Sequence, residues 1–236
     1  MGLANSPRFF QHRMETIFGP YLWQWVLVYI DDIIIFSQTI KDHLAHLGKA
    51  LQLLEQSGVS LSISKCHFGY PSITALGHYV LRLGLSTVQE KTEAIRDLDY
   101  PQSLRQLETG LGFLGYYRKF VEYYAAIAEP LMQLKTAGFK AAPPKGKWRQ
   151  AHVEHVRYID SLAFTDECKA AWDTLKDKLC TAPTLMHPDF SKGFILYCDG
   201  SKERGYGAAL HQKDNEGIER PILYLSKTLD KHERNY

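Results

Sequence analysis

Two adjacent aspartates, Asp31 and Asp32, separate two runs of β-branched and aromatic residues at positions 26–30 and 33–36. Runs of this kind joined by two turn residues predict a β-hairpin, which here has the two aspartates as its turn. Adjacent carboxylates are costly to desolvate unless a cation or hydrogen-bond donors compensate them. The hairpin therefore has two interpretations. It is either a site for a hard cation such as Mg²⁺ that handles phosphate groups, or a solvated turn that tolerates aspartate well.

Hydrophobic periodicity and capping signals predict the other elements. Helices are expected at residues 7–19, 41–56 and 165–179 and after the N-cap Ser103. The buried face of the second helix is expected to consist of Leu44, Leu47, Leu51 and Leu54. Strands are expected at 59–63, 66–69, 73–81, 194–198, 206–211 and 221–225, and a loop or linker at 136–150. Helices mixed with antiparallel hairpins, without βαβ alternation, indicate the α+β class.

The charge of the chain is uneven. It has 28 Lys and Arg against 26 Asp and Glu, a formal net charge of +2 that indicates no particular partner. Residues 135–157, however, hold one carboxylate, Glu154, and six cations: Lys135, Lys140, Lys145, Lys147, Arg149 and Arg157. This basic strip is either a nucleic-acid footprint or a solvated linker, and charge alone favours neither.

The cysteines and the apolar segments indicate the cellular compartment in which the chain is expected. Four cysteines, at positions 66, 168, 180 and 198, lack the spacing of a zinc site or a disulfide framework, which favours a reducing compartment. The longest apolar stretch is too short to span a bilayer, and no basic-then-apolar leader is present. We therefore expect an intracellular chain without a membrane partner.

Several motifs occur in one order along the chain. Gly-Leu-Ala-Asn-Ser-Pro-Arg-Phe-Phe-Gln at 2–11 precedes Tyr-Ile-Asp-Asp at 29–32, Ser-Lys-Cys-His-Phe at 64–68 and Leu-Gly-His-Tyr-Val at 76–80. Phe-Leu-Gly-Tyr-Tyr-Arg-Lys-Phe follows at 113–120, and Leu-Tyr-Cys-Asp-Gly-Ser at 196–201 precedes Gly-Tyr-Gly-Ala at 205–208. The first five motifs resemble the reverse transcriptase of gypsy-type long-terminal-repeat retroelements. The last two resemble the opening of a ribonuclease H domain.

The resemblance implies a role for each matching residue. Asp31 and Asp32 match the catalytic metal ligands of the polymerase palm, and Asp199 matches the first carboxylate of the ribonuclease H metal site. The implied nucleotide- and primer-binding residues are Phe10, Gln11, Tyr29, Lys65, Leu76, Gly77 and His78. The expected contacts with the nucleic-acid backbone are Tyr117, Arg118 and Lys119, together with Lys145 and Lys147 of the basic strip. The implied cofactor is Mg²⁺, with Mn²⁺ as a substitute, whereas Glu233 is expected to be structural or exposed.

The resemblance also implies an order of domains. We expect a partial palm at 1–98, thumb or connection helices at 99–135, the basic linker at 136–163 and a truncated ribonuclease H-like domain at 164–236. A palm needs a further aspartate on a strand upstream of residues 2–11, and a ribonuclease H domain needs three more carboxylates. We expect both sets to be absent from this chain.

The chain is therefore interpreted as a fragment of a retrotransposon polyprotein. Its parent would carry out RNA-directed DNA synthesis by Mg²⁺-dependent nucleotidyl transfer and carry a ribonuclease H endonuclease. The implied partners are an RNA or DNA template–primer, deoxynucleoside triphosphates and the missing polyprotein segments, in cytoplasmic retroelement particles or in the nucleus. Because phosphoryl transfer depends on positioning and metal charge, the isolated chain is expected to be nearly inactive. The alternative is a domesticated or decayed remnant that only binds nucleic acid or a protein partner.

Overall fold

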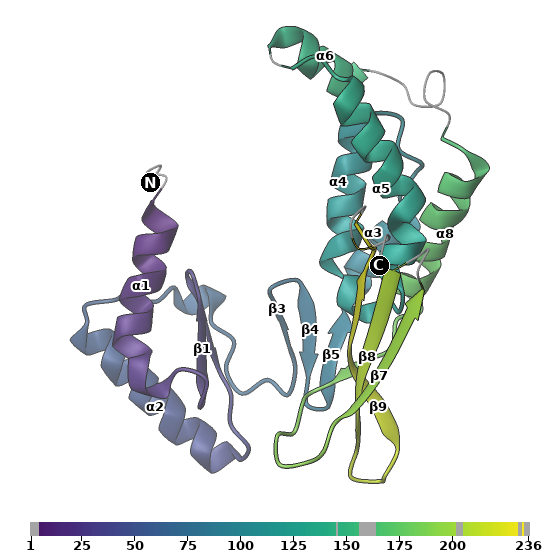
Figure 1. Ribbon diagram of the computed structural model, residues 1–236. Coiled ribbons are helices and arrows are strands. Elements are labelled where there is room, and N and C mark those ends of the chain that lie inside the picture. The colour runs from purple at the N-terminus through teal and green to yellow at the C-terminus, as the bar shows by residue number, and fades with distance from the viewer. Residues whose placement is uncertain (1–4, 145, 156–163, 202–204, 231–232, 234–236) are drawn as a thin grey trace. The chain divides into compact units, whose positions relative to one another are not determined.

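A computed structural model describes residues 5–144, 146–155, 164–201, 205–230 and 233. The chain forms two compact units, Met1–Pro71 and Ser72–Tyr236 (Figure 1). Each unit mixes helices with antiparallel strands, so the predicted α+β class is confirmed. Within the described residues, no helix is both long enough and apolar enough to cross a membrane.

The first unit is a β-hairpin packed on two helices. Helix α1 (Ser6–Phe18) continues into a short 3₁₀ turn, Gly19–Tyr21, and leads to strands β1 (Val26–Tyr29) and β2 (Asp32–Ile35). Helix α2 (Ile40–Gln56) follows, and a second 3₁₀ turn covers Ile63–Lys65. The buried core comprises Met14, Phe18, Trp25, Val26, Ala50 and Leu54. The predicted strands at 59–63 and 66–69 are wrong, because no strand forms there.

Helix α2 begins and ends where its sequence predicts, but its buried face is narrower than expected. The Thr39 hydroxyl caps the helix by accepting a hydrogen bond from the Asp42 amide at 3.1 Å. Of the predicted apolar face only Leu54 is buried, whereas Leu44 is 64% and Leu51 is 42% exposed. A two-stranded hairpin is too small to cover a wide helical stripe, so the core contact is confined to Ala50 and Leu54.

The second unit contains a four-stranded antiparallel sheet of order β3-β4-β5-β6. Its strands are β3 (Ile73–Ala75), β4 (His78–Leu81), β5 (Gly84–Thr87) and β6 (Leu185–Met186). The single strand predicted at 73–81 is therefore a hairpin. Its turn consists of Leu76 (φ 48°) and Gly77 (φ 70°), both in the left-handed region. A β-carbon on Gly84 would lie 2.0 Å from the Leu185 carbonyl oxygen, so glycine is required where β5 meets β6.

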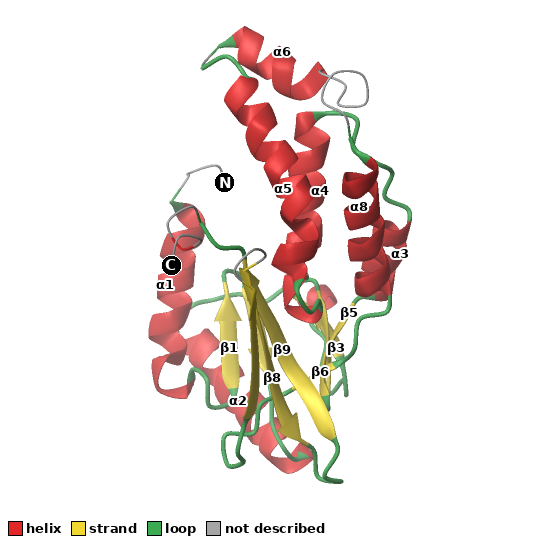
Figure 2. Cartoon of the chain, turned by 45° about the vertical axis from the view of Figure 1, so that its right-hand side comes forward, coloured by secondary structure: helices red, strands yellow, loops and turns green. Residues whose placement is uncertain are grey.

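The helices of this unit are α3 (Gln89–Arg96), α4 (Leu104–Tyr116), α5 (Tyr124–Ala141), α6 (Lys147–His155) and α8 (Asp166–Cys180), with a 3₁₀ turn at Arg118–Phe120. Figure 2 shows α4, α5 and α8 side by side, with α6 at one end of them. The capping prediction is confirmed, since the Ser103 hydroxyl accepts a hydrogen bond from the Gln106 amide at 3.2 Å. The predicted loop at 136–150 is wrong over most of its length. Helix α5 continues to Ala141 and α6 starts at Lys147, because packing around Leu104, Leu134, Phe139 and Val153 overrides the local glycine and proline signals.

The last strands form an antiparallel sheet of order β7-β8-β9. They are β7 (Ile195–Ser201), β8 (Gly205–Lys213) and β9 (Glu219–Lys227), close to the predicted ranges. A turn joins β8 to β9, and the Asp214 carboxylate holds it by accepting hydrogen bonds from the amides of Glu216 and Ile218, each at 2.9 Å. The buried Gln212 side chain ties β8 to the loop that precedes β7 through the backbone of Asp189.

Candidate functional site

The hairpin that carries the aspartates is bonded to α1 through one side chain. The Gln11 Oε1 atom accepts a hydrogen bond from the Ile30 amide, and Gln11 Nε2 donates to the Val28 carbonyl at 3.3 Å. Ile30 has φ 54°, a conformation that a β-branched residue rarely adopts. Gln11 thus satisfies the backbone on both sides of Tyr29 and holds the strained residue that precedes Asp31.

The position of the turn corrects the sequence-based hairpin by one residue. Tyr29 pairs with Asp32 in the ladder, so the two-residue turn is Ile30-Asp31, and Asp32 is the first residue of β2. Both aspartates are exposed. Within the described residues neither carboxylate has a hydrogen-bond or ion-pair partner in the chain.

Two free carboxylates suit a hard cation. Mg²⁺ is commonly held by one or two carboxylates while water and substrate phosphates complete its coordination. The pair Asp31 and Asp32 fits that partial ligand set. No group of three or more His, Cys, Asp or Glu side chains in the described part of the chain is arranged to hold a metal ion.

The other predicted nucleotide-binding residues of the first unit lie on its surface. Phe10 on α1 is 37% exposed and Tyr29 at the end of β1 is 52% exposed. Lys65 ends the 3₁₀ turn and is also exposed. Gln11 differs from them, because its amide is occupied by the hairpin backbone. Gln11 therefore stabilises the hairpin through its backbone.

In the second unit, two predicted sets of residues meet at the β3–β4 turn. The Tyr117 hydroxyl donates a hydrogen bond to the Gly77 carbonyl at 2.9 Å, and the Tyr116 hydroxyl donates to the Leu76 carbonyl. A β-carbon on Gly77 would lie 3.4 Å from the Tyr116 ring. The predicted primer-binding turn is therefore held by tyrosines at the end of α4. One of them, Tyr117, was expected to contact the nucleic-acid backbone.

His78 lies inside this cluster. Its ring centroid is 5.2 Å from that of Tyr116, 5.6 Å from Tyr117 and 5.8 Å from Phe120, and its Nδ1 atom lies 2.9 Å from the Leu76 carbonyl oxygen. Burial, and then the nearby Lys119 ammonium, lower the pKa of His78, against the opposite effect of the Leu76 carbonyl. The lowered pKa favours the neutral form of His78. Its ring packs against the tyrosines that hold the turn.

The predicted backbone-contacting residues divide into buried and accessible ones. Tyr117 is 1% exposed, so its side chain contributes to the core and to the turn. Arg118 is exposed and Lys119 is half-buried, with Nζ 5.4 Å from the centroid of the Phe120 ring. Lys147 is exposed at the start of α6, whereas Lys145 lies outside the described residues.

Asp199 lies on β7 and lines a cavity of about 470 Å³ together with Glu122, Tyr123, Thr174, Lys178 and Gly207. The Tyr123 hydroxyl donates a hydrogen bond to Asp199 Oδ2 at 3.3 Å. Burial and the carboxylates of Asp199 and Glu122 raise the pKa of Tyr123, which keeps it a hydrogen-bond donor. Sequence reasoning missed Tyr123 and Glu122, since no local signal links them to a strand so distant in the chain.

Glu233 has the structural environment that its sequence context predicts. Its carboxylate accepts hydrogen bonds from the Lys227 ammonium at 2.5 Å and the Asp230 amide at 2.9 Å. His46, on α2, stacks on Trp25 with ring centroids 4.7 Å apart and forms a hydrogen bond with the Ser37 hydroxyl at 2.7 Å. Both residues therefore have structural partners.

Two segments of the chain match known families. Residues 1–80 match the family described as reverse transcriptase (RNA-dependent DNA polymerase), and residues 164–236 match the RNase H-like domain found in reverse transcriptase. The segment that holds the carboxylate hairpin thus resembles a reverse transcriptase, and the segment that holds strands β7, β8 and β9 resembles a ribonuclease H-like domain.

Relatives narrow this class. Along all of its length the chain is 34% identical over 235 residues to the retrovirus-related Pol polyprotein from transposon opus of Drosophila melanogaster, covering 22% of that protein. It is also 31% identical over 236 residues to that from transposon gypsy, of which it covers 21%. The chain corresponds to part of the reverse transcriptase and ribonuclease H region of a retrotransposon Pol polyprotein, as its motifs predict. It spans about a fifth of the length of these relatives.

Solved structures share the fold. A foamy viral protease-reverse transcriptase in complex with double-stranded DNA matches with a TM-score of 0.76 at 22% identity, over 99% of this chain and 37% of the viral chain. The same kind of viral protein in complex with an RNA/DNA hybrid matches with a TM-score of 0.73 at 22% identity, over 99% and 28% of the two chains.

Proposed function

We propose that this chain supplies the catalytic hairpin, the thumb and the first ribonuclease H strands of an RNA-directed DNA polymerase. Its substrates are deoxynucleoside triphosphates and an RNA or DNA template–primer. One observation carries the proposal: Asp31 and Asp32 are adjacent, exposed and without a partner in the described chain, on a hairpin that Gln11 ties to α1. The viral neighbours bound to double-stranded DNA and to an RNA/DNA hybrid support the substrate class.

The described residues have separable tasks in nucleotidyl transfer. A bound Mg²⁺ supplies positive charge that favours attack of a primer 3′ hydroxyl on a nucleoside triphosphate. Asp31 and Asp32 offer hard oxygen ligands, and Gln11 orients the backbone immediately before them. Leu76, Gly77 and His78 present a rigid turn toward the primer because Tyr116 and Tyr117 bind its carbonyls. Asp199 offers one ligand of the ribonuclease H site.

Metal binding tests the assignment of the hairpin directly. Titration with Mn²⁺, followed by its electron paramagnetic resonance signal, is expected to detect a weak site that Asp31→Asn or Asp32→Asn removes. Asp177→Asn serves as the control, because Asp177 is an exposed carboxylate on α8 outside the proposed site. Equal Mn²⁺ binding in all four proteins contradicts the proposed metal site.

Primer extension tests the activity of the chain. With Mg²⁺ or Mn²⁺ and an RNA template annealed to a DNA primer, we expect the isolated chain to extend the primer barely or not at all. The described residues bring only two carboxylates together at the hairpin, whereas catalysis of phosphoryl transfer depends on complete metal positioning. Robust extension that Asp31→Asn abolishes contradicts the expected inactivity and supports the catalytic role of Asp31.

A second candidate function is nucleic-acid binding without synthesis, as expected of a domesticated or decayed remnant. The exposed cations Arg118 and Lys147 favour it. It predicts salt-dependent binding of template–primer that is unchanged by Asp31→Asn. Loss of binding in Asp31→Asn, or binding indifferent to salt, contradicts this candidate.

A further inference from the structure

Helix α6 presents a tryptophan to solvent. Trp148 is 81% exposed, although α6 is packed on the rest of its unit through Val153, which is 8% exposed and lies in one cluster with Leu104 and Phe139. The packing of α6 therefore does not need the indole ring, which leaves its aromatic surface accessible.

The N-terminal end of α6 is anchored, so Trp148 has a defined position. The Arg149 guanidinium donates a hydrogen bond from Nη1 to the Pro143 carbonyl at 3.0 Å and lies 5.8 Å from the centroid of the Phe139 ring. These contacts join the first turn of α6 to the connection that precedes it and to α5. Arg149 is thus committed to structure, and its neighbours on either side face solvent.

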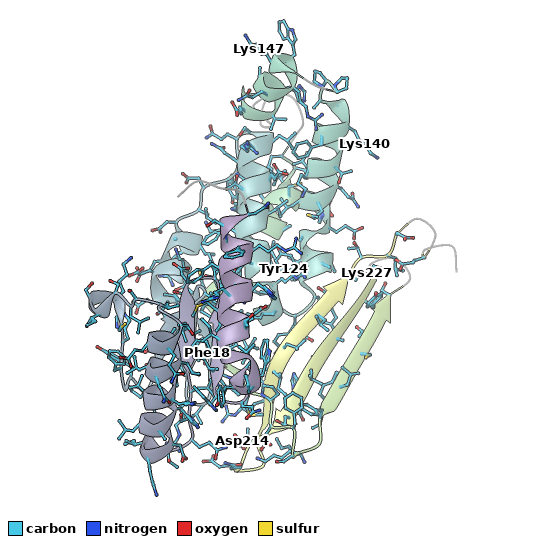
Figure 3. All side chains as sticks on the ribbon, turned by 90° about the vertical axis from the view of Figure 1, so that its left-hand side faces the viewer. Phe18, Tyr124, Lys140, Lys147, Asp214 and Lys227 are labelled. Carbon is cyan, nitrogen blue, oxygen red and sulfur yellow. The ribbon has the colours of Figure 1, made fainter. Side chains whose placement is uncertain are left out.

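Two exposed lysines lie at the same end of the helical region as Trp148. Lys147 precedes Trp148, and Figure 3 shows Lys140, near the end of α5, at the same end of the helical region. Both lysines are exposed, and neither has an ion-pair partner among the residues that the structure describes. The described residues between 135 and 155 contain four cations and a single carboxylate, Glu154.

We propose that Trp148, Lys140 and Lys147 form a binding site for single-stranded nucleic acid. The indole stacks on an unpaired base while the two ammonium groups contact phosphates, a combination of aromatic and basic side chains suited to single strands. In a duplex the faces of the bases are stacked on each other and are unavailable. A membrane surface fits less well, because the exposed side chains around Trp148 include Lys147 and Gln150 and offer no broad apolar face. The site uses none of the palm carboxylates and goes beyond the proposed polymerase function.

Fluorescence anisotropy of a labelled single-stranded oligonucleotide of about ten nucleotides tests the proposal with the full chain. Trp148→Leu is expected to weaken binding by about 5- to 100-fold, the loss of one stacked base, whereas Trp148→Tyr retains an aromatic face and most of the affinity. The matched control is Trp23→Leu, since Trp23 is 82% exposed and its sequence neighbours, Leu22 and Gln24, carry no charge. Circular dichroism verifies that each variant keeps its helices.

Salt and competitor measurements complete the test. Lys140→Gln and Lys147→Gln should each reduce the slope of log affinity against log salt concentration by about 0.7. Equal affinity of Trp148→Leu and the parent chain, an equal loss in Trp23→Leu, or the same loss with a duplex oligonucleotide overturns the proposal. So does a Trp148-dependent response to anionic phospholipid vesicles with none to the oligonucleotide.

Discussion

Gln11 on α1 accepts a hydrogen bond from the amide of Ile30, the positive-φ residue that precedes Asp31. The same side chain donates to the Val28 carbonyl at 3.3 Å and to the Glu15 carboxylate at 2.7 Å. A two-stranded hairpin is marginally stable by itself. The geometry of the carboxylate hairpin therefore depends on a residue of a separate helix.

Replacing Gln11 by Ala should loosen the hairpin without unfolding α1. It leaves the Ile30 amide without its acceptor, and we expect a loss of about 1–2 kcal/mol in the local stability of the hairpin. Hydrogen exchange followed by mass spectrometry should show faster exchange for residues 26–35, and the Mn²⁺ titration should show weaker binding. Gln56→Ala is the control, because Gln56 is exposed at the end of α2. Unchanged exchange in Gln11→Ala contradicts the role of this side chain.

Alanine substitutions at two glycines of α4 should have opposite effects on the stability of the protein. A β-carbon on Gly110 would lie 2.4 Å from the buried Trp172 ring, whereas one on Gly112 meets nothing within 4 Å. Gly110→Ala should therefore destabilise the protein by about 1–3 kcal/mol through overpacking. Gly112→Ala should stabilise it by up to about 1 kcal/mol through helix propensity. Urea unfolding followed by circular dichroism measures both, and a stabilised Gly110→Ala contradicts the close approach of α4 and α8.

Local patterns in the sequence predict much of this fold, because caps and periodicity act over a few residues. Helix α4 begins at the predicted cap, Ser103, and α2 begins close to its predicted start. The shifted hairpin turn was not predictable in this way, since a positive φ at Ile30 is sustained by a bond to a distant helix. The turn at Leu76 is likewise held by tyrosines 40 residues away in the chain.

The candidate site is predictable to a similar extent. A motif identifies Asp31, Asp32 and Asp199 because it is contiguous in sequence. The contacts that orient them come from side chains elsewhere in the chain, such as Tyr123, whose hydroxyl reaches Asp199 across 76 positions. Such contacts depend on tertiary packing, which no local pattern encodes.

Tyr117→Phe should weaken the β3–β4 turn. The hydroxyl that it removes is the donor to the Gly77 carbonyl at 2.9 Å, in a residue that is 1% exposed. The Gly77 carbonyl is partly buried, so the loss is that of one hydrogen bond, about 0.5–1.5 kcal/mol. The midpoint of urea unfolding should therefore fall, and amide exchange at residues 73–81 should accelerate. Tyr70→Phe, in a side chain that is 63% exposed, should change neither. Equal behaviour of the two variants contradicts a supporting role for the Tyr117 hydroxyl.

His78 should make the stability of the second unit depend on pH. Burial and the Lys119 charge lower its pKa in the folded chain below the ordinary value of 6.5. As the pH falls through 6.5, His78 binds a proton in the unfolded chain before it does so in the folded chain. The contribution of His78 to stability is therefore fully present above pH 6.5 and is lost as the pH falls toward its lower pKa in the folded chain. The free energy of unfolding should therefore fall on acidification, and less so in His78→Gln. Lys119→Gln should raise the pKa of His78, as followed by NMR titration of its ring protons, because it removes the neighbouring positive charge. A His78 pKa at or above its ordinary value in the folded parent chain contradicts this account.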